Sequence, residues 1–112
     1  SYHTYDPYSF CNDNGQYNIN IFNASCEAEI DNMLKLTSDR FSELGIPFIV
    51  GEFGAIDNKK SMSERIKYAK YMMTKLREHG TTGIWWMGLY DRKTATWYEN
   101  EIADALMSVT NQ

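Results

Sequence analysis

The chain has 112 residues, of which 43% are hydrophobic and 23% charged, so it forms at most one ordinary globular domain over residues 1–112. Its formal net charge is −4, and no basic cluster exceeds the pair Lys59-Lys60, which excludes the basic stripe of a nucleic-acid-binding protein. No stretch approaches the roughly 20 apolar residues that cross a bilayer, so no membrane partner is expected. The sequence has no Cys/His metal spacing and no phosphate loop, so neither a metal nor a cofactor is expected.

Two features of the composition leave alternatives open. Aromatic residues make up 14% of the chain, with eight Tyr and three Trp. Such side chains fill cores, but their flat rings also stack on pyranose rings in sugar-binding clefts. The cysteines Cys11 and Cys26 have a spacing that suits a disulfide worth roughly 3 kcal/mol, and they suit two free buried thiols equally well.

The first part of the chain predicts a short strand, a long loop and a helix. Residues 2–5 are aromatic and form a strand that ends at the breaker Asp6-Pro7. Residues 11–25 are rich in Asn and predict a surface loop. A helix is expected from Glu27 until Gly45 stops it. Its apolar stripe recurs at spacings of three and four: Ile30, Met33, Leu34, Thr37, Phe41 and Leu44.

The second part continues the alternation of strands and helices. Residues 47–51 are a continuous apolar run, which predicts a parallel strand covered on both faces. Ser61 and Glu64 form a capping box that opens a helix ending near Gly80. A third strand is predicted over residues 83–87, and a last helix starts at about residue 99. The apolar faces of these two helices comprise Ile66, Ala69, Met72, Met73 and Leu76, and then Ile102, Leu106 and Val109.

The resulting βαβαβα order predicts a parallel sheet with right-handed crossovers. Three such units leave both sheet edges open and the centre unfilled, which is a liability for a stand-alone protein. The first residues, 1–5, also read as the middle of a strand. We therefore expect a portion of a larger α/β architecture.

The strongest candidate for chemistry is Glu52, which follows the apolar run directly. Functional groups of α/β folds gather where strands end, and a carboxylate at this point is costly to bury without a partner. Gly51 and Gly54 on either side allow close approach by a ligand or a neighbouring segment. The alternative is a strand-terminal Glu paired with a structural Arg or with a helix N-terminus.

Four further residues are considered together with Glu52. His3 and Tyr5 are two apart in the first strand, so they share one side and both reach toward a carboxylate on the adjacent strand. A Tyr hydroxyl that donates to Glu52 favours its ionised form, as a nucleophile requires. The alternative is an aromatic pair in the core. Trp85 and Trp86 face opposite ways, so one belongs to the core and the other is a candidate sugar platform.

Four motifs, in order, resemble glycoside hydrolase family 5, in its cellulase and endoglucanase branch. They are the segments His3-Thr4-Tyr5-Asp6-Pro7-Tyr8-Ser9-Phe10, Gly45-Ile46-Pro47-Phe48-Ile49-Val50-Gly51-Glu52-Phe53-Gly54-Ala55, Trp85-Trp86 and Gly88-Leu89-Tyr90-Asp91-Arg92-Lys93-Thr94. The combination of Pro-x-x-x-Gly-Glu-Phe-Gly with an upstream His-x-Tyr pair is the specific part, since either alone is weak. The resemblance covers nearly the whole chain.

The resemblance implies a partial TIM (β/α)₈ barrel, with this chain supplying strands six to eight and their helices. It implies that Glu52 is the nucleophile at the end of strand seven and that His3 and Tyr5 line the cleft from strand six. Trp86 matches the tryptophan of strand eight that stacks under the sugar. Relatives usually carry Asp-Asn-Gly and a longer loop after that tryptophan, whereas here Met87 runs directly into Gly88.

The resemblance also implies retaining hydrolysis of β-1,4-glucan with two carboxyl groups about 5–5.5 Å apart. The acid/base Glu of the family follows an Asn on strand four, and this sequence contains no counterpart. We therefore expect the C-terminal portion of the barrel only, with the nucleophile half of the site.

Its partners are then a β-glucan polysaccharide or oligosaccharide and a separate N-terminal barrel segment or a second copy of the chain. A polymeric substrate implies a secreted, cell-surface or periplasmic protein of bacterial type. The alternative is a non-catalytic half-barrel that self-associates or binds glycan without turnover.

Overall fold

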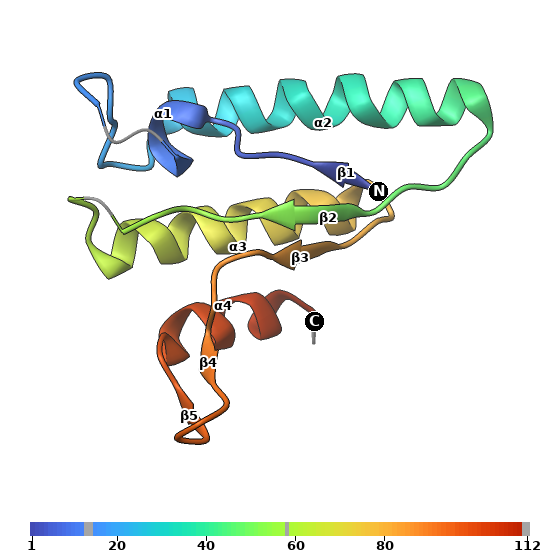
Figure 1. Ribbon diagram of the computed structural model, residues 1–112. Helices are drawn as coiled ribbons and strands as arrows, with labels where there is room; N and C mark the ends of the chain where they lie inside the picture. The colour runs from blue at the N-terminus through green and yellow to red at the C-terminus, as the bar shows by residue number, and fades with distance from the viewer. Residues whose placement is uncertain (13–14, 58, 111–112) are drawn as a thin grey trace.

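A computed structural model describes residues 1–12, 15–57 and 59–110. Three strands form a parallel sheet in the order β1-β2-β3, as the sequence predicts, and two further short strands form a separate hairpin (Figure 1). The elements in chain order are β1 (Tyr2–His3), α1 (Tyr8–Cys11), α2 (Ala24–Leu44), β2 (Val50–Phe53), α3 (Met62–Glu78), β3 (Gly83–Trp85), β4 (Tyr90–Asp91), β5 (Thr96–Trp97) and α4 (Asn100–Thr110).

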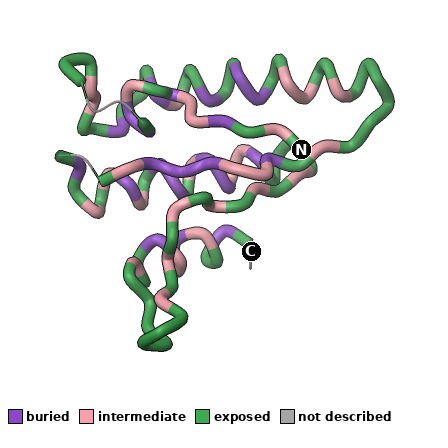
Figure 2. The backbone as a smooth tube through the Cα atoms, in the orientation of Figure 1, coloured by how far each residue is buried: buried purple, intermediate pink, exposed green. Residues whose placement is uncertain are grey.

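The core lies between the sheet and its helices. Figure 2 shows buried residues along β2 and on α2 and α3, while the hairpin of β4 and β5 is exposed. Val50 and Phe53 are fully buried, and Tyr68 of α3 packs its ring near those of Phe53, Phe10 and Phe22. Helix α3 lies behind β2 and β3 in Figure 1, and within the described part of the chain no helix covers the face turned toward the viewer. The sheet is therefore covered on one face only.

Strand boundaries differ from the predicted ones. The run predicted as a strand over residues 47–51 becomes β2 only at Val50, and the strand continues through Glu52 to Phe53. The prediction was wrong because apolarity alone marked the strand, whereas pairing with β1 and β3 starts at Val50. Likewise β3 ends at Trp85 rather than at residue 87. Glu52 consequently lies within the last two residues of a strand and is held by its ladder.

Helix α2 begins at Ala24, three residues before the predicted start, because the Asn23 side chain accepts a hydrogen bond from Cys26 N and caps the helix. The predicted loop over 11–25 is therefore shorter, and its residues 13 and 14 lie outside the described ones.

Cys11 and Cys26 are both buried free thiols. The end of the predicted stripe on α2 is also wrong, because Leu44 is exposed at the last turn.

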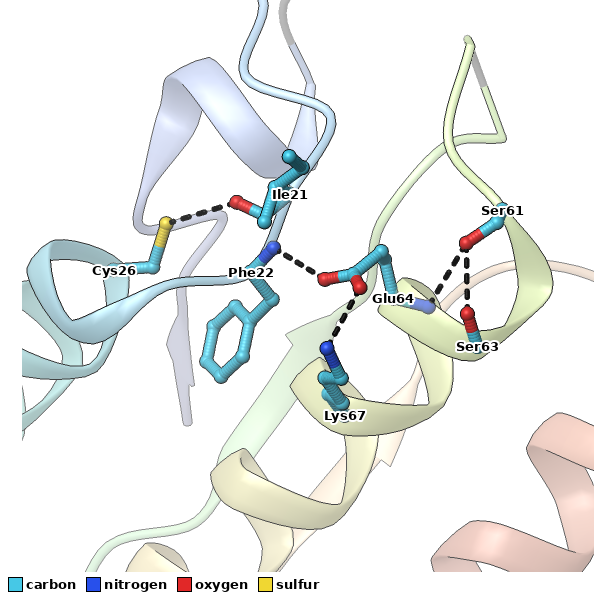
Figure 3. A network of polar contacts seen from close by, with 7 residues as sticks. All are labelled: Ile21, Phe22, Cys26, Ser61, Ser63, Glu64 and Lys67. Atoms are coloured by element: carbon cyan, nitrogen blue, oxygen red, sulfur yellow. Dashed lines mark hydrogen bonds and ion pairs between the residues drawn. The ribbon is translucent and has the colours of Figure 1, made fainter.

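Helix α3 begins at the predicted cap, but the predicted capping box is only half formed. Ser61 Oγ accepts from Glu64 N, whereas the Glu64 carboxylate does not face back to the cap (Figure 3). It accepts instead from Phe22 N and from Lys67 Nζ, each at 2.7 Å. Glu64 thus ties the start of α3 to the segment before α2.

Among the described residues no helix is long and apolar enough to cross a membrane.

The close approach of β3 to α3 predicts the effect of a small substitution. A Cβ at Gly83 would lie 2.7 Å from Leu76 Cδ1 and 2.8 Å from Phe53 Cε1, both fully buried. We expect Gly83→Ala to lower the free energy of unfolding by roughly 1–3 kcal/mol, because the core is overpacked. Urea unfolding measures this. Gly88→Ala is the control, since a Cβ there meets nothing within 4 Å, and an equal loss in both variants contradicts the expectation.

The Glu64 contacts predict a pH-dependent contribution to stability. The Lys67 ammonium, and next the hydrogen bond from Phe22 N, lower the pKa of Glu64 below its ordinary value of 4.5. A lowered carboxyl pKa stabilises the fold above the unfolded value, and this contribution is lost as the pH falls through the folded pKa. We expect the stability difference between the natural chain and Glu64→Gln to shrink as the pH falls below 4.5. Urea unfolding over a pH series measures it, with Glu78→Gln on the same helix as control.

Candidate active site

The candidate active site centres on Glu52 at the C-terminal end of β2. Its Oε2 accepts a hydrogen bond from Tyr5 Oη at 3.0 Å, and His3 Nδ1 lies 3.5 Å from the same oxygen. The parallel register places His3 directly opposite Glu52, and Thr4 N donates to Glu52 O at 2.9 Å. The structure therefore brings the three predicted residues together around one carboxylate.

Glycine makes room for this arrangement on the β1 side. A Cβ at Gly51 would lie 3.0 Å from Ser1 Cβ and 3.5 Å from His3 Nε2. On the other side, a Cβ at Gly54 would lie 3.2 Å from Met87 Cε. Both glycines that flank Glu52 thus allow neighbouring segments of the chain to approach the strand end closely.

The Tyr5 phenol is fixed as a hydrogen-bond donor. Burial, and then the hydrogen bond to the charged Glu52, raise the pKa of Tyr5 to about 12. The phenol therefore keeps its proton throughout the neutral range and donates it to the carboxylate. Glu52 itself is partly accessible, since 22% of its side chain is exposed, so a ligand approaching from the open face of the sheet reaches it.

An open hollow of about 660 Å³ lies beside this group. Its lining residues are Tyr5, Asn12, Ile56, Trp86, Met87 and Gly88. Trp86 is 62% exposed, whereas the ring of Trp85 packs edge-on to Phe53 with centroids 5.6 Å apart. The two tryptophans therefore face opposite ways, and Trp86 is the one that lies at the hollow.

Backbone contacts connect the hollow to the strand that carries Glu52. Trp86 N donates to Phe53 O at 2.8 Å, one residue beyond Glu52. Ile56 N donates to Cys11 O at 2.9 Å, which ties the loop after β2 to α1. Side chains from β1, β2 and the segment after β3 thus share one edge of the sheet.

Within the described ranges no group of three or more His, Cys, Asp or Glu side chains is arranged to hold a metal ion.

One polar pair near this edge was missed by sequence reasoning. Arg65 is 3% exposed, and its guanidinium forms two hydrogen bonds with Glu99, at 2.6 and 3.1 Å. Its Nε also donates to Ala55 O at 3.0 Å, three residues after Glu52. A signal was present in the sequence, because Arg65 is in phase with the apolar stripe of α3 at Ala69 and Met72.

The C-terminal edge of parallel strands is where enzymes of the α/β barrel class hold their functional groups, and an exposed tryptophan beside a carboxylate suits stacking on a sugar ring. Residues 1–91 match the family described as Cellulase (glycosyl hydrolase family 5). The chain therefore belongs to glycosyl hydrolase family 5, which confirms the resemblance seen in its motifs.

Individual relatives agree with this assignment. Endoglucanase A of Clostridium longisporum is 32% identical over an alignment 124 residues long. The alignment covers 96% of this chain and 23% of that protein. A solved broad-specificity endoglucanase from the same organism superposes with a TM-score of 0.87 at 28% identity, over 97% of this chain and 35% of that one. A lichenase from Caldicellulosiruptor sp. F32, solved with cellotetraose, has a TM-score of 0.86 at 31% identity, over 96% and 33%. The chain thus spans about a third or less of these relatives, and its fold corresponds to part of their barrel.

The contact between Tyr5 and Glu52 predicts a titration. We expect Glu52→Gln to lower the pKa of Tyr5 from about 12 toward its ordinary value of 10.0, because the neutral amide no longer favours the protonated phenol. Carbon NMR of the tyrosine Cζ resonances, titrated with base, measures it. Glu43→Gln is the matched control on α2, and an unchanged Tyr5 titration in Glu52→Gln contradicts the expectation.

Proposed function

We propose that the protein is a retaining endo-β-1,4-glucanase in which this chain supplies the nucleophile half of the active site. Glu52 is the nucleophile, His3 and Tyr5 hold and orient its carboxylate, and Trp86 is the platform for the sugar. The observation that carries the proposal is the hydrogen bond from Tyr5 to Glu52 beside the hollow at Trp86. In this proposal β1, β2 and β3 correspond to strands six, seven and eight of the barrel.

The chemistry follows from the carboxylate and its neighbours. Glu52 attacks the anomeric carbon, the glycosidic bond to the leaving oxygen breaks, and a covalent glycosyl-enzyme forms. A second carboxyl group, about 5–5.5 Å away, protonates the leaving oxygen and then removes a proton from the water that hydrolyses the intermediate. Tyr5 supports the first step, because its high pKa keeps it a donor that orients the attacking carboxylate rather than a second base.

The second carboxylate and the remaining cleft come, in this proposal, from polypeptide outside residues 1–112. The chain spans 23% of Endoglucanase A from Clostridium longisporum, which supports the presence of further barrel segments in the working enzyme. The exposed sheet face around His3 and Ile84 supports the same view, because parallel sheets are normally covered on both faces.

The proposed substrate is a β-glucan chain or its oligosaccharides. Relatives named endoglucanase and a lichenase solved with cellotetraose support this class. Because a polymeric glucan does not enter cells, the proposal includes secretion or exposure at the cell surface. The alternative is a half-barrel that binds glycan or a second copy without turnover, and the exposed face of the sheet suits that function as well.

Substitution of the nucleophile tests the proposal in the natural full-length protein. We expect Glu52→Gln to lower kcat on carboxymethylcellulose by on the order of 10⁴-fold or more, because a neutral amide cannot form the glycosyl ester. Glu43→Gln, which removes an exposed ion pair on α2, keeps full activity.

Covalent trapping separates the nucleophile from other essential groups. A 2-deoxy-2-fluoro-cellobioside with a dinitrophenolate leaving group needs little acid assistance and accumulates the glycosyl-enzyme. We expect peptide mass spectrometry to find the label on Glu52. Binding of cellotetraose without turnover or labelling establishes the non-catalytic alternative, and a label on another carboxylate refutes the role of Glu52.

A further inference from the structure

Arg65 carries a positive charge in a buried position, where an unpaired charge destabilises the fold. It lies in the first turns of α3, is 3% exposed, and faces the same side as the buried Ala69 and Met72. A buried cation persists only when its donors are paired. Arg65 has such partners on two different segments, which are the Glu99 carboxylate and the Ala55 carbonyl oxygen.

The two partners belong to the loops that leave the proposed site. Ala55 is fully buried and follows Glu52 by three residues, in the loop that delivers Ile56 to the hollow. Glu99 ends the segment that starts at Trp86, and its carbonyl oxygen accepts hydrogen bonds from the first turn of α4. Arg65 therefore joins the loop after β2 and the segment after β3 to helix α3 without lining the hollow itself.

The loop after Glu52 is thus held from both sides. On the helix side Arg65 Nε donates to Ala55 O at 3.0 Å, and on the α1 side Cys11 O accepts from Ile56 N at 2.9 Å. The planar guanidinium makes all three hydrogen bonds at once in a fixed geometry, which a lysine ammonium at the end of a flexible stem does not reproduce.

We propose that Arg65, paired with Glu99, is a positioning residue that fixes the loop after β2 and thereby the nucleophile Glu52. It touches neither the hollow nor the carboxylate of Glu52, so it acts through the backbone. The inference rests on the proposed function and adds to it a residue on α3. A displacement of about 1 Å at a reacting group can cost on the order of 10²-fold in rate, so such a support has a measurable effect.

An apolar replacement separates positioning from plain stabilisation. Replacing a buried ion pair by well-packed apolar residues often preserves or raises stability, whereas removing one partner destabilises the fold strongly. The double variant Arg65→Met/Glu99→Leu therefore keeps the fold but loses the donor to Ala55 O. In the natural full-length protein we expect it to keep a cooperative urea transition whose midpoint falls only modestly, because Ala55 O loses its donor. We expect kcat to fall by roughly 10- to 100-fold and KM to change little.

Arg65→Lys provides a second variant that keeps the charge beside Glu99. We expect a similar loss in kcat, because one ammonium cannot satisfy Glu99 and Ala55 together. The matched control is Arg40→Met/Glu43→Leu, which removes an exposed ion pair on α2 and leaves kcat unchanged.

Amide hydrogen exchange gives a readout that does not depend on turnover. We expect the Ile56 amide to exchange at least about tenfold faster in both Arg65 variants, with the amides of α2 unchanged, because only the loop is released. Full kcat together with unchanged Ile56 exchange, in folded Arg65 variants, overturns the inference. Failure of the proposed function gives a different result, because Glu52→Gln then keeps its activity on carboxymethylcellulose, independently of any effect of the Arg65 variants.

Discussion

The parallel pairing of β1 with β2 is the constraint on which the rest of the site depends. It sets His3 opposite Glu52 and joins Thr4 N to Glu52 O, so that Tyr5 arrives at the carboxylate two residues later. The same pairing directs Val50 and Phe53 to the helices. The register shifts in both pairings of β2, so that Val50 and Phe53, three residues apart, are both buried while Glu52 lies with His3 and Tyr5 at the strand end.

The two faces of the sheet have different physical roles. The helix face is close-packed by aromatic rings, with Tyr68 of α3 in contact with the rings of Phe53 and Trp85. The opposite face leaves His3 and Trp86 more than half exposed. The chemistry proposed at Glu52 depends on that second face, because helix α3 packs against the other one.

The helix side supports the strand ends without reaching the hollow. Arg65 binds the loop after β2 and the residue that precedes α4, while Glu64, its neighbour in sequence, binds the backbone before α2. Two adjacent charged residues at the start of α3 thus tie three separate segments to one helix. This arrangement explains why short strands of two to four residues suffice to hold the site.

The sequence by itself determined the alternation of strands and helices, because apolar periodicity and caps are local signals that survive in any context. It also indicated the group of Glu52, His3 and Tyr5 from side-chain alternation and the strand-end rule, although an aromatic pair in the core remained the alternative until the structure placed both side chains at the carboxylate. It missed the hairpin of Tyr90 and Trp97, whose two-residue strands are too short to show a period. Only the tertiary structure decided where β2 begins and that Arg65 binds Glu99, whereas the family resemblance had already indicated Trp86 rather than Trp85 as the tryptophan of the cleft. These features depend on contacts between residues distant in the chain, such as the 34 positions that separate Arg65 from Glu99, and no local pattern encodes such a contact.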